Sequence, residues 1–160
     1  MAEKRYLIAT ACNRKYEDFL LNHWFRSLKD NVDLSEIDVL IMDYGLSEDI
    51  VQKLSEQGAI VRKASEREGL INNTRFFELA DFLEQETNYE KVAITDSGDL
   101  IFQADISDLF ETDCKIAGVV EEISPAIDIL IKRGYIPSYD EITKVLKGKK
   151  LINVGFLIGS

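Results

Sequence analysis

Two carboxylates stand close together directly after an apolar run in the middle of the chain. The run is VAIT at positions 92–95, and Asp96 and Asp99 follow it with only Ser97 and Gly98 between them. Carboxylate oxygens suit hard cations such as Mg²⁺ and Mn²⁺, and a site with one or two of them leaves positions for substrate phosphates. An ordinary turn is the alternative reading, because Asp, Ser and Gly all favour turns.

Three further places carry polar side chains that suit a ligand. Asn153 begins an apolar strand with Gly155 two residues on, so it either presents an amide to a polar ligand or simply starts the strand. Arg75 lies near the start of a predicted helix, where it either binds an anion such as diphosphate or lies on the surface. Asn13 and Tyr16 follow the first apolar run and suit either a nucleobase or a helix cap and a core tyrosine.

Several common catalytic motifs are absent from the sequence. It contains no G-x-G-x-x-G, no phosphate-binding P-loop and no G-x-S-x-G. His23 is the only histidine, which disfavours a hydrolytic triad or a His-rich zinc site and favours a histidine on a helix face. The acidic pair follows roughly the fourth predicted strand, whereas receiver domains and haloacid-dehalogenase-type phosphatases place theirs after the first.

Composition bounds the class of protein. The chain has 160 residues, of which 46% are hydrophobic, enough for one domain with its own core. Its formal net charge of −10 disfavours binding to nucleic acid or to an anionic membrane. No apolar run approaches the roughly 20 residues of a transmembrane helix. Cys12 and Cys114 fit no metal-binding spacing and indicate reduced thiols in a cytoplasmic protein.

Strands and helices must position these side chains. Apolar runs of strand length alternate along the chain with segments in which apolar residues recur at helical spacing. Alternation of this kind predicts an α/β fold of three layers, with a mostly parallel sheet flanked by helices. We predict strands at 6–11, 37–42, 59–61, 92–95, 116–120 and 151–158. We predict helices at 15–29, 47–57 and 73–85, with two short ones within 124–134 and 138–148. Ligands of such sheets bind outside the carboxyl ends of the strands, which points to residues 12–13, 43–45, 96–99 and 159–160.

The last predicted strand, at 151–158, is apolar along its length and has no following helix to cover it. We therefore expect the strand to be covered on both faces by something beyond these 160 residues. Either the domain is truncated at its C-terminus, or this end associates with a second copy of the chain.

In order and spacing, these features resemble the nucleotide-diphospho-sugar transferases with the GT-A fold, most closely glycosyltransferase family 8. Five segments carry the resemblance: TACNRKY at 10–16, GLS at 45–47, TRFF at 74–77, DLIFQADISDLF at 99–110 and NVGF at 153–156. The acidic motif of the family is D-x-D. Asp99 matches its second Asp, while Ser97 stands at the position of the first and Asp96 comes one residue early.

The resemblance implies a metal-dependent, hexosyltransferase-like enzyme that moves a sugar from a nucleoside-diphosphate sugar to a glycan, lipid or protein acceptor. Its cofactor would be Mn²⁺ or Mg²⁺, which neutralises the departing diphosphate. The implied donor-binding residues are Thr10, Asn13, Tyr16, Arg75, Asp96 and Asn153. The implied metal ligands are Asp99, as the main ligand, and Asp96, which orients it or binds through water.

A degenerate GT-A-like module that holds a sugar nucleotide without turnover is the alternative function. The family continues into a later half with acceptor contacts and a further metal-ligating histidine. We therefore expect residues 1–160 to be a single sugar-nucleotide-binding domain, the N-terminal part of a longer catalytic domain, with weak or no turnover alone.

Overall fold

A six-stranded sheet forms the centre of the molecule in a computed structural model, which describes residues 4–86, 88–120, 139–146, 149–150 and 152–160. The strands are β1 (Tyr6–Cys12), β2 (Ile37–Asp43), β3 (Ile60–Lys63), β4 (Lys91–Thr95), β5 (Ile116–Val120) and β6 (Ile152–Gly159). Their order across the sheet is β3-β2-β1-β4-β6-β5. The strands from β3 to β4 are parallel, and β6 runs antiparallel to both β4 and β5. The predicted mostly parallel α/β sheet is confirmed.

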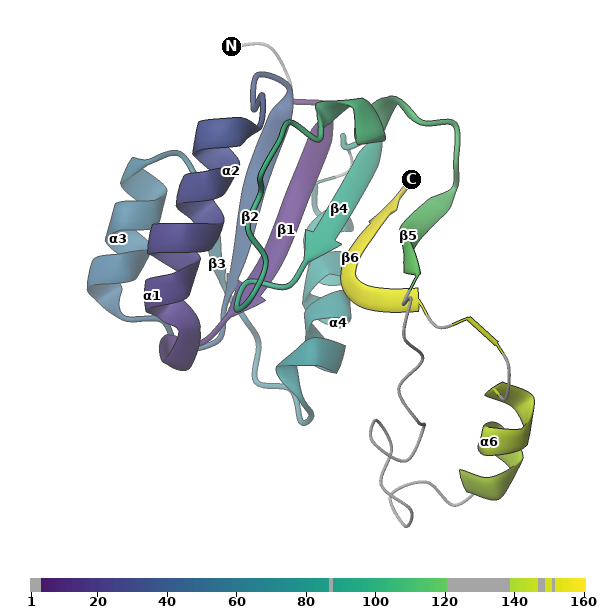
Figure 1. Cartoon of the computed structure of the whole chain (residues 1–160). Helices are drawn as coiled ribbons and strands as arrows, with labels where there is room; N and C mark the ends of the chain where they lie inside the picture. Colours follow the sequence, from purple (N-terminus) through teal and green to yellow (C-terminus); the bar gives the residue numbers. More distant parts are fainter. Residues whose placement is uncertain (1–3, 87, 121–138, 147–148, 151) are drawn as a thin grey trace.

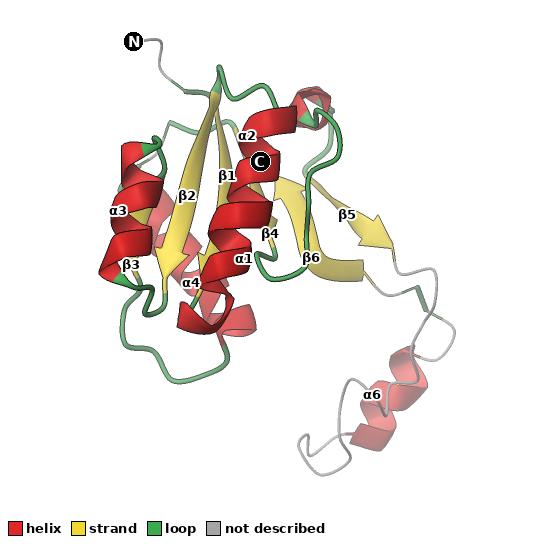
Figure 2. Cartoon of the chain, turned by 60° about the vertical axis from the view of Figure 1, so that its left-hand side comes forward, coloured by secondary structure: helices red, strands yellow, loops and turns green. Residues whose placement is uncertain are grey.

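Helices cover both faces of the sheet (Figures 1 and 2). After the short turn η1 (Arg14–Tyr16), one continuous helix consists of α1 (Glu17–Phe19), the π-helical segment η2 (Leu20–Phe25) and α2 (Arg26–Asn31). This helix lies with α3 (Glu48–Glu56) on one face, and α4 (Ile71–Leu83) lies on the other. The remaining helices among the described residues are η3 (Ser107–Glu111) and α6 (Tyr139–Leu146). The short helix predicted within 124–134 lies outside the described residues, as do positions 138 and 148 that flank α6.

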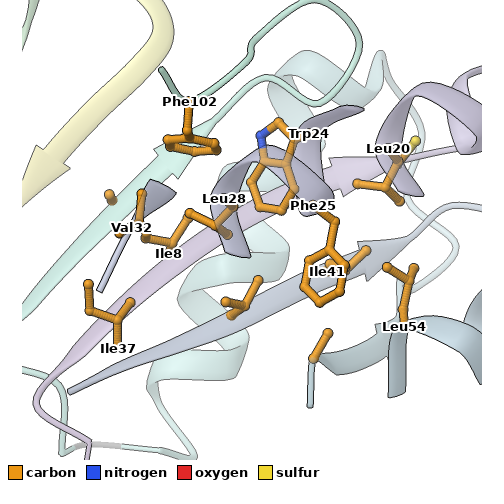
Figure 3. Close-up of a cluster of buried hydrophobic side chains, with 14 of the residues drawn as sticks. Ile8, Leu20, Trp24, Phe25, Leu28, Val32, Ile37, Ile41, Leu54 and Phe102 are labelled. Atoms are coloured by element: carbon orange, nitrogen blue, oxygen red, sulfur yellow. The ribbon is translucent and has the colours of Figure 1, made fainter. Parts of the chain in front are cut away.

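Strand β1 is buried along its whole length, as its apolar run predicts. Its Ile8 packs among Trp24 and Phe25 of the α1–α2 helix (Figure 3). The residues of β1 between these positions, such as Ala9, point to the other face of the sheet and pack against Leu79 and other residues of α4. The two helical layers thus hold β1 at the middle of the sheet and fix the position of its carboxyl end.

The direction of β6 corrects one expectation. Thr95, at the carboxyl end of β4, pairs with Phe156, and Val92, near its amino end, pairs with Gly159. Residues 159–160 therefore lie at the opposite edge of the sheet from the predicted ligand site. The start of β6, with Asn153, lies at the ligand edge instead.

Strands β5 and β6 are more exposed than an apolar sequence suggests. All five residues of β5 are exposed, and so are Ile152 and Val154 of β6. Within β6 the buried positions are Gly155 and Ile158, so the described part of this chain leaves the first residues of the strand uncovered. The expectation that something beyond these 160 residues covers the strand stays a prediction. Every helix in the described ranges is too short or too polar to span a membrane.

Candidate sugar-nucleotide pocket

A pocket of about 520 Å³ opens at the carboxyl ends of β1 and β4. Three segments line it: residues 11–13 with Tyr16 after β1, residues 70–72 with Arg75 of α4, and residues 96–99 after β4. This is the edge of the sheet at which parallel strands present ligand-binding residues. The structure thus brings together five predicted site residues: Asn13, Tyr16, Arg75, Asp96 and Asp99.

Asp96 is held in an ion pair by the guanidinium of Arg75. The same guanidinium donates from Nη2 to the carbonyl oxygen of Val154 at 2.9 Å and from Nη1 to that of Thr95 at 3.5 Å. The Arg75 side chain is 3% exposed and that of Asp96 is 36% exposed. The Nε of Arg75 is buried without a hydrogen-bond partner among the described residues. Arg75 therefore joins α4 to the end of β4 and the start of β6.

Asp99 differs from Asp96 in being free of such contacts. It is exposed at the pocket, and within the described ranges it forms no hydrogen bond or ion pair through its carboxylate. Between the two acids, Ser97 is buried and its hydroxyl donates to the carbonyl oxygen of Ala11 at 2.8 Å. Asp99 is therefore the carboxylate of this motif that remains available to a ligand.

Asn13 and Tyr16 form the wall that follows β1. The Oδ1 of Asn13 accepts the backbone N–H of Lys15 at 3.1 Å, so the predicted cap is present. Tyr16 is 43% exposed, which makes the core-tyrosine alternative wrong. The Nζ of Lys15 lies 4.7 Å from the centre of the Tyr16 ring and donates to its hydroxyl at 3.0 Å. The exposed ring offers a surface on which a planar ligand can stack.

Thr10 and Asn153, also predicted from the resemblance, do not line the pocket. Thr10 is fully buried, and its hydroxyl donates to the Thr95 carbonyl oxygen at 2.9 Å. Trp24 donates from Nε1 to the hydroxyl oxygen of Thr95 at 3.0 Å, so both residues support the end of β4. Asn153 accepts the N–H of Gly155 at 2.6 Å, beside the Arg75 contact with β6.

The sequence indicates the start of helix α4 as a place for an anion, but it does not indicate that Leu70 and Ile71 line the pocket. The predicted helix began at position 73, whereas α4 begins at Ile71 with Leu70 as its N-cap. Leucine is not a residue that marks a helix start, and here it supplies no side-chain cap. The available signal was Gly69, whose φ of +134° is favoured only by glycine and marks the turn before the helix.

Cys12 also lines the pocket, as a buried free thiol. Burial raises the pKa of the Cys12 thiol, and hydrogen bonds to Ser97 and Asn13 only partly oppose that effect. The neutral thiol is therefore the form that borders a ligand at neutral pH.

The pocket fits a cation that is shared with a phosphate ligand. In the described part of the chain, no group of three or more His, Cys, Asp or Glu residues is arranged to hold a metal ion alone. Mg²⁺-type ions are commonly held by one or two carboxylates together with substrate phosphates. Asp99 supplies one such carboxylate, and Asp96 is already engaged by Arg75. The donor set is thus suited to a cation that binds together with a diphosphate.

The comparison with known proteins identifies the fold. No protein-family model and no curated protein matches the sequence. The apo structure of the bifunctional glycosyltransferase WbbM matches with a TM-score of 0.65 and 14% identity, covering 99% of this chain and 32% of that one. Apo GlyE of Streptococcus pneumoniae TIGR4, a glycosyltransferase, matches with a TM-score of 0.60 and 20% identity, covering 98% and 34%.

A third match is the galactosyltransferase LgtC in complex with donor and acceptor sugar analogues. Its TM-score is 0.57 at 18% identity, covering 95% of this chain and 56% of that one. The chain thus spans 32–56% of the length of these three proteins. The chain has the GT-A fold of these glycosyltransferases, as the sequence resemblance predicts, while membership of glycosyltransferase family 8 stays a prediction.

Proposed function

We propose that residues 1–160 form the sugar-nucleotide-binding domain of a glycosyltransferase. The enzyme transfers a sugar from a nucleoside-diphosphate sugar to a glycan, lipid or protein acceptor. One observation carries the proposal: a pocket at the carboxyl ends of β1 and β4 combines an exposed aromatic ring, a helix N-terminus and a carboxylate, that of Asp99, which has no partner among the described residues. These groups match the base, the diphosphate and the cation of such a donor.

The nucleobase binds against Tyr16, next to Asn13. An exposed tyrosine ring gains apolar contact and favourable stacking when a planar base covers it. The diphosphate lies near the start of α4, where Ile71 and Asn72 line the pocket. Leu70 gives no side-chain cap, and its carbonyl oxygen accepts the N–H groups of Asn73 and Thr74. The N–H groups of Ile71 and Asn72 are therefore the ones available to an anion. The helix dipole favours negative charge there. Asn153, at the start of β6 and outside the lining of the pocket, would reach only a part of the donor sugar that extends beyond the pocket.

Asp99 holds a Mn²⁺ or Mg²⁺ ion together with the diphosphate. Asp96 either binds this ion through a water molecule or orients Asp99. When bound, the ion supplies charge neutralisation to the diphosphate as the bond from the anomeric carbon to oxygen breaks. The side chains of the pocket bind and orient the donor so that an acceptor oxygen can attack that carbon.

Binding without turnover is the second candidate function. It is favoured by the departure from D-x-D, because Ser97 replaces the first Asp of the motif and the hydroxyl of Ser97 is committed to Ala11. It is also favoured by the ion pair that engages Asp96. A domain of this kind would hold a sugar nucleotide or present it to a partner.

Titration calorimetry tests both candidates on the whole chain. Uridine, guanosine and thymidine diphosphates and their hexose derivatives are titrated in turn, with Mn²⁺ and with chelator. Binding of one of them in Mn²⁺ supports donor binding, which both candidate functions require. Release of free hexose from the bound donor supports the enzyme, and binding without release supports the binding module. Absence of heat for all nucleotides contradicts the proposal. Asp113→Asn is the control, because Asp113 is an exposed acid in a second hollow away from the donor pocket.

We also propose a cytoplasmic location for the chain. Both cysteines are free, Cys12 being buried and Cys114 partly exposed, which is typical of a reducing compartment. Labelling of Cys114 in intact cells by a membrane-permeant maleimide, but not by an impermeant one, tests the location.

A further inference from the structure

We propose that Arg75 is a positioning residue, which shapes the donor pocket through Asp96 and β6 instead of binding the donor itself. The binding test of this inference rests on the proposed function. Its structural test, amide exchange on the unliganded chain, needs no ligand.

The contacts of Arg75 leave little of its guanidinium for a donor. Nη1 is engaged by Asp96 and by the Thr95 carbonyl oxygen, and Nη2 by the Val154 carbonyl oxygen. The remaining nitrogen, Nε, is buried. Arginine suits such a junction because its planar, forked group can bind a carboxylate and backbone oxygens at the same time.

Two elements that line the pocket meet the neighbouring strand β6 at this guanidinium. Arg75 belongs to α4, whose first turn lines the pocket, and Asp96 begins the acidic segment that follows β4. Val154 belongs to the start of β6, next to Asn153. A change in Arg75 therefore alters the relative positions of all three elements without touching a ligand.

Gly155 gives independent evidence that this junction is closely packed. The backbone N–H of Asp96 donates to the Gly155 carbonyl oxygen at 2.8 Å. A Cβ at position 155 would lie 2.8 Å from Oδ2 of Asp96 and 2.7 Å from Oδ1 of Asn153. The Asp96 carboxylate thus fits between Arg75 on one side and the glycine of β6 on the other. Oδ1 of Asp96 is engaged by Arg75, whereas Asp99 has no such contact in the described ranges, which favours Asp99 as the carboxylate for the donor.

Amide hydrogen exchange on the unliganded chain tests the structural half of the inference. In Arg75→Lys, we expect the Asp96 amide, which closes the β4–β6 junction, to exchange at least tenfold faster. The amides of Leu40 and Ile41 in β2 should stay protected, because they lie in the sheet away from the junction. Unchanged exchange at Asp96 overturns the proposal. Should Arg75→Lys not fold, Asp96→Asn is read at the amide of residue 96, which donates to the Gly155 carbonyl oxygen, with the same expectation and the same contrary result.

A double-mutant cycle tests the binding half. The dissociation constant of a nucleoside diphosphate in Mn²⁺ is measured for Arg75→Lys, Asp96→Asn and the double variant. If Arg75 acts through Asp96, the double variant binds no more weakly than the weaker single variant. If Arg75 touches the donor, its substitution costs the same factor in both backgrounds, and that result overturns the inference. If the parent chain binds no nucleotide, that result contradicts the proposed function alone, because the exchange experiment needs no ligand and still tests the role of Arg75.

Discussion

The ring of Tyr16 lies against Gly98, the residue that precedes Asp99. A Cβ at position 98 would come within 3.4 Å of Cδ1 of the ring. The aromatic surface after β1 and the acidic segment after β4 therefore share one wall of the pocket. A ligand that covers Tyr16 therefore also lies close to the acidic segment.

Removal of the Tyr16 ring tests this arrangement. We expect Tyr16→Ala to weaken nucleoside diphosphate binding by about 1–3 kcal/mol, the range that base–aromatic stacking contributes elsewhere. Tyr16→Phe keeps the ring and should bind nearly as well as the parent. Calorimetry of both variants makes the measurement, and equal affinity of Tyr16→Ala and the parent would show that the base binds elsewhere.

Gly155→Ala tests the close packing at the β4–β6 junction. The added methyl group would meet Asp96 and Asn153 at less than 3.0 Å, so one of them must move. Overpacking of this kind costs about 1–3 kcal/mol of unfolding free energy. Urea denaturation measures the loss. Gly98→Ala is the matched control, since its Cβ would make only a marginal contact with Tyr16, and an equal loss in both variants would contradict the account.

Glu78 should make the stability of the chain sensitive to acid. Burial alone would raise the pKa of its carboxyl group, but hydrogen bonds from the Ser65 hydroxyl, the Ser65 N–H and Arg67 outweigh burial and lower it. A lowered pKa contributes stability that is present above the unfolded pKa of about 4.3 and is lost as the pH falls through the folded pKa.

Glu78→Gln is the variant that tests this contribution. Its side chain is 5% exposed, so we expect a loss of about 1–3 kcal/mol at pH 7. The difference between variant and parent should shrink as the pH falls toward 3. Urea midpoints across this range measure it, with Glu84→Gln at an exposed position as the control. A difference that does not depend on pH would refute the assignment to the charge of Glu78.

The exposed edge strand β5 leads us to predict that the chain self-associates. This strand lies at the edge of the sheet, all its residues are exposed, and it carries no charge or proline that would discourage pairing with another strand. Sedimentation of the chain should show dimers at high concentration. Val119→Lys should abolish them, because lysine on an edge strand opposes pairing, whereas Val145→Lys on α6 should not. A parent chain that stays monomeric would contradict the prediction.

Much of the fold follows from local patterns. The strand predicted at 116–120 has those bounds in the structure, and α3 begins after Ser47 as its polar start indicates. Gly58 ends α3 with a φ of +95°, the conformation for which glycine is chosen at helix ends. The position of the pocket also followed, because parallel strands present their carboxyl ends at one edge.

Relationships between distant segments did not follow from the sequence. The hydrophobic pattern marks β6 as a strand but does not give its direction, so the expectation that residues 159–160 lie at the ligand edge is wrong. The helix predicted at 15–29 contains the π-helical segment η2, which an average helical period does not reveal. The ion pair of Arg75 and Asp96 joins residues 21 positions apart, and only the packing of α4 on the sheet brings them together.

The central claim is that Asp99 and a divalent cation together bind the diphosphate of a sugar nucleotide. The most direct test is calorimetric titration of a nucleoside diphosphate into the parent chain and into Asp99→Asn, with Mn²⁺ and with chelator. We predict binding to the parent in Mn²⁺, and at least tenfold weaker binding both on removal of Mn²⁺ and in Asp99→Asn, which corresponds to about 1.4 kcal/mol or more. Equal affinity of Asp99→Asn and the parent in Mn²⁺ would contradict the account.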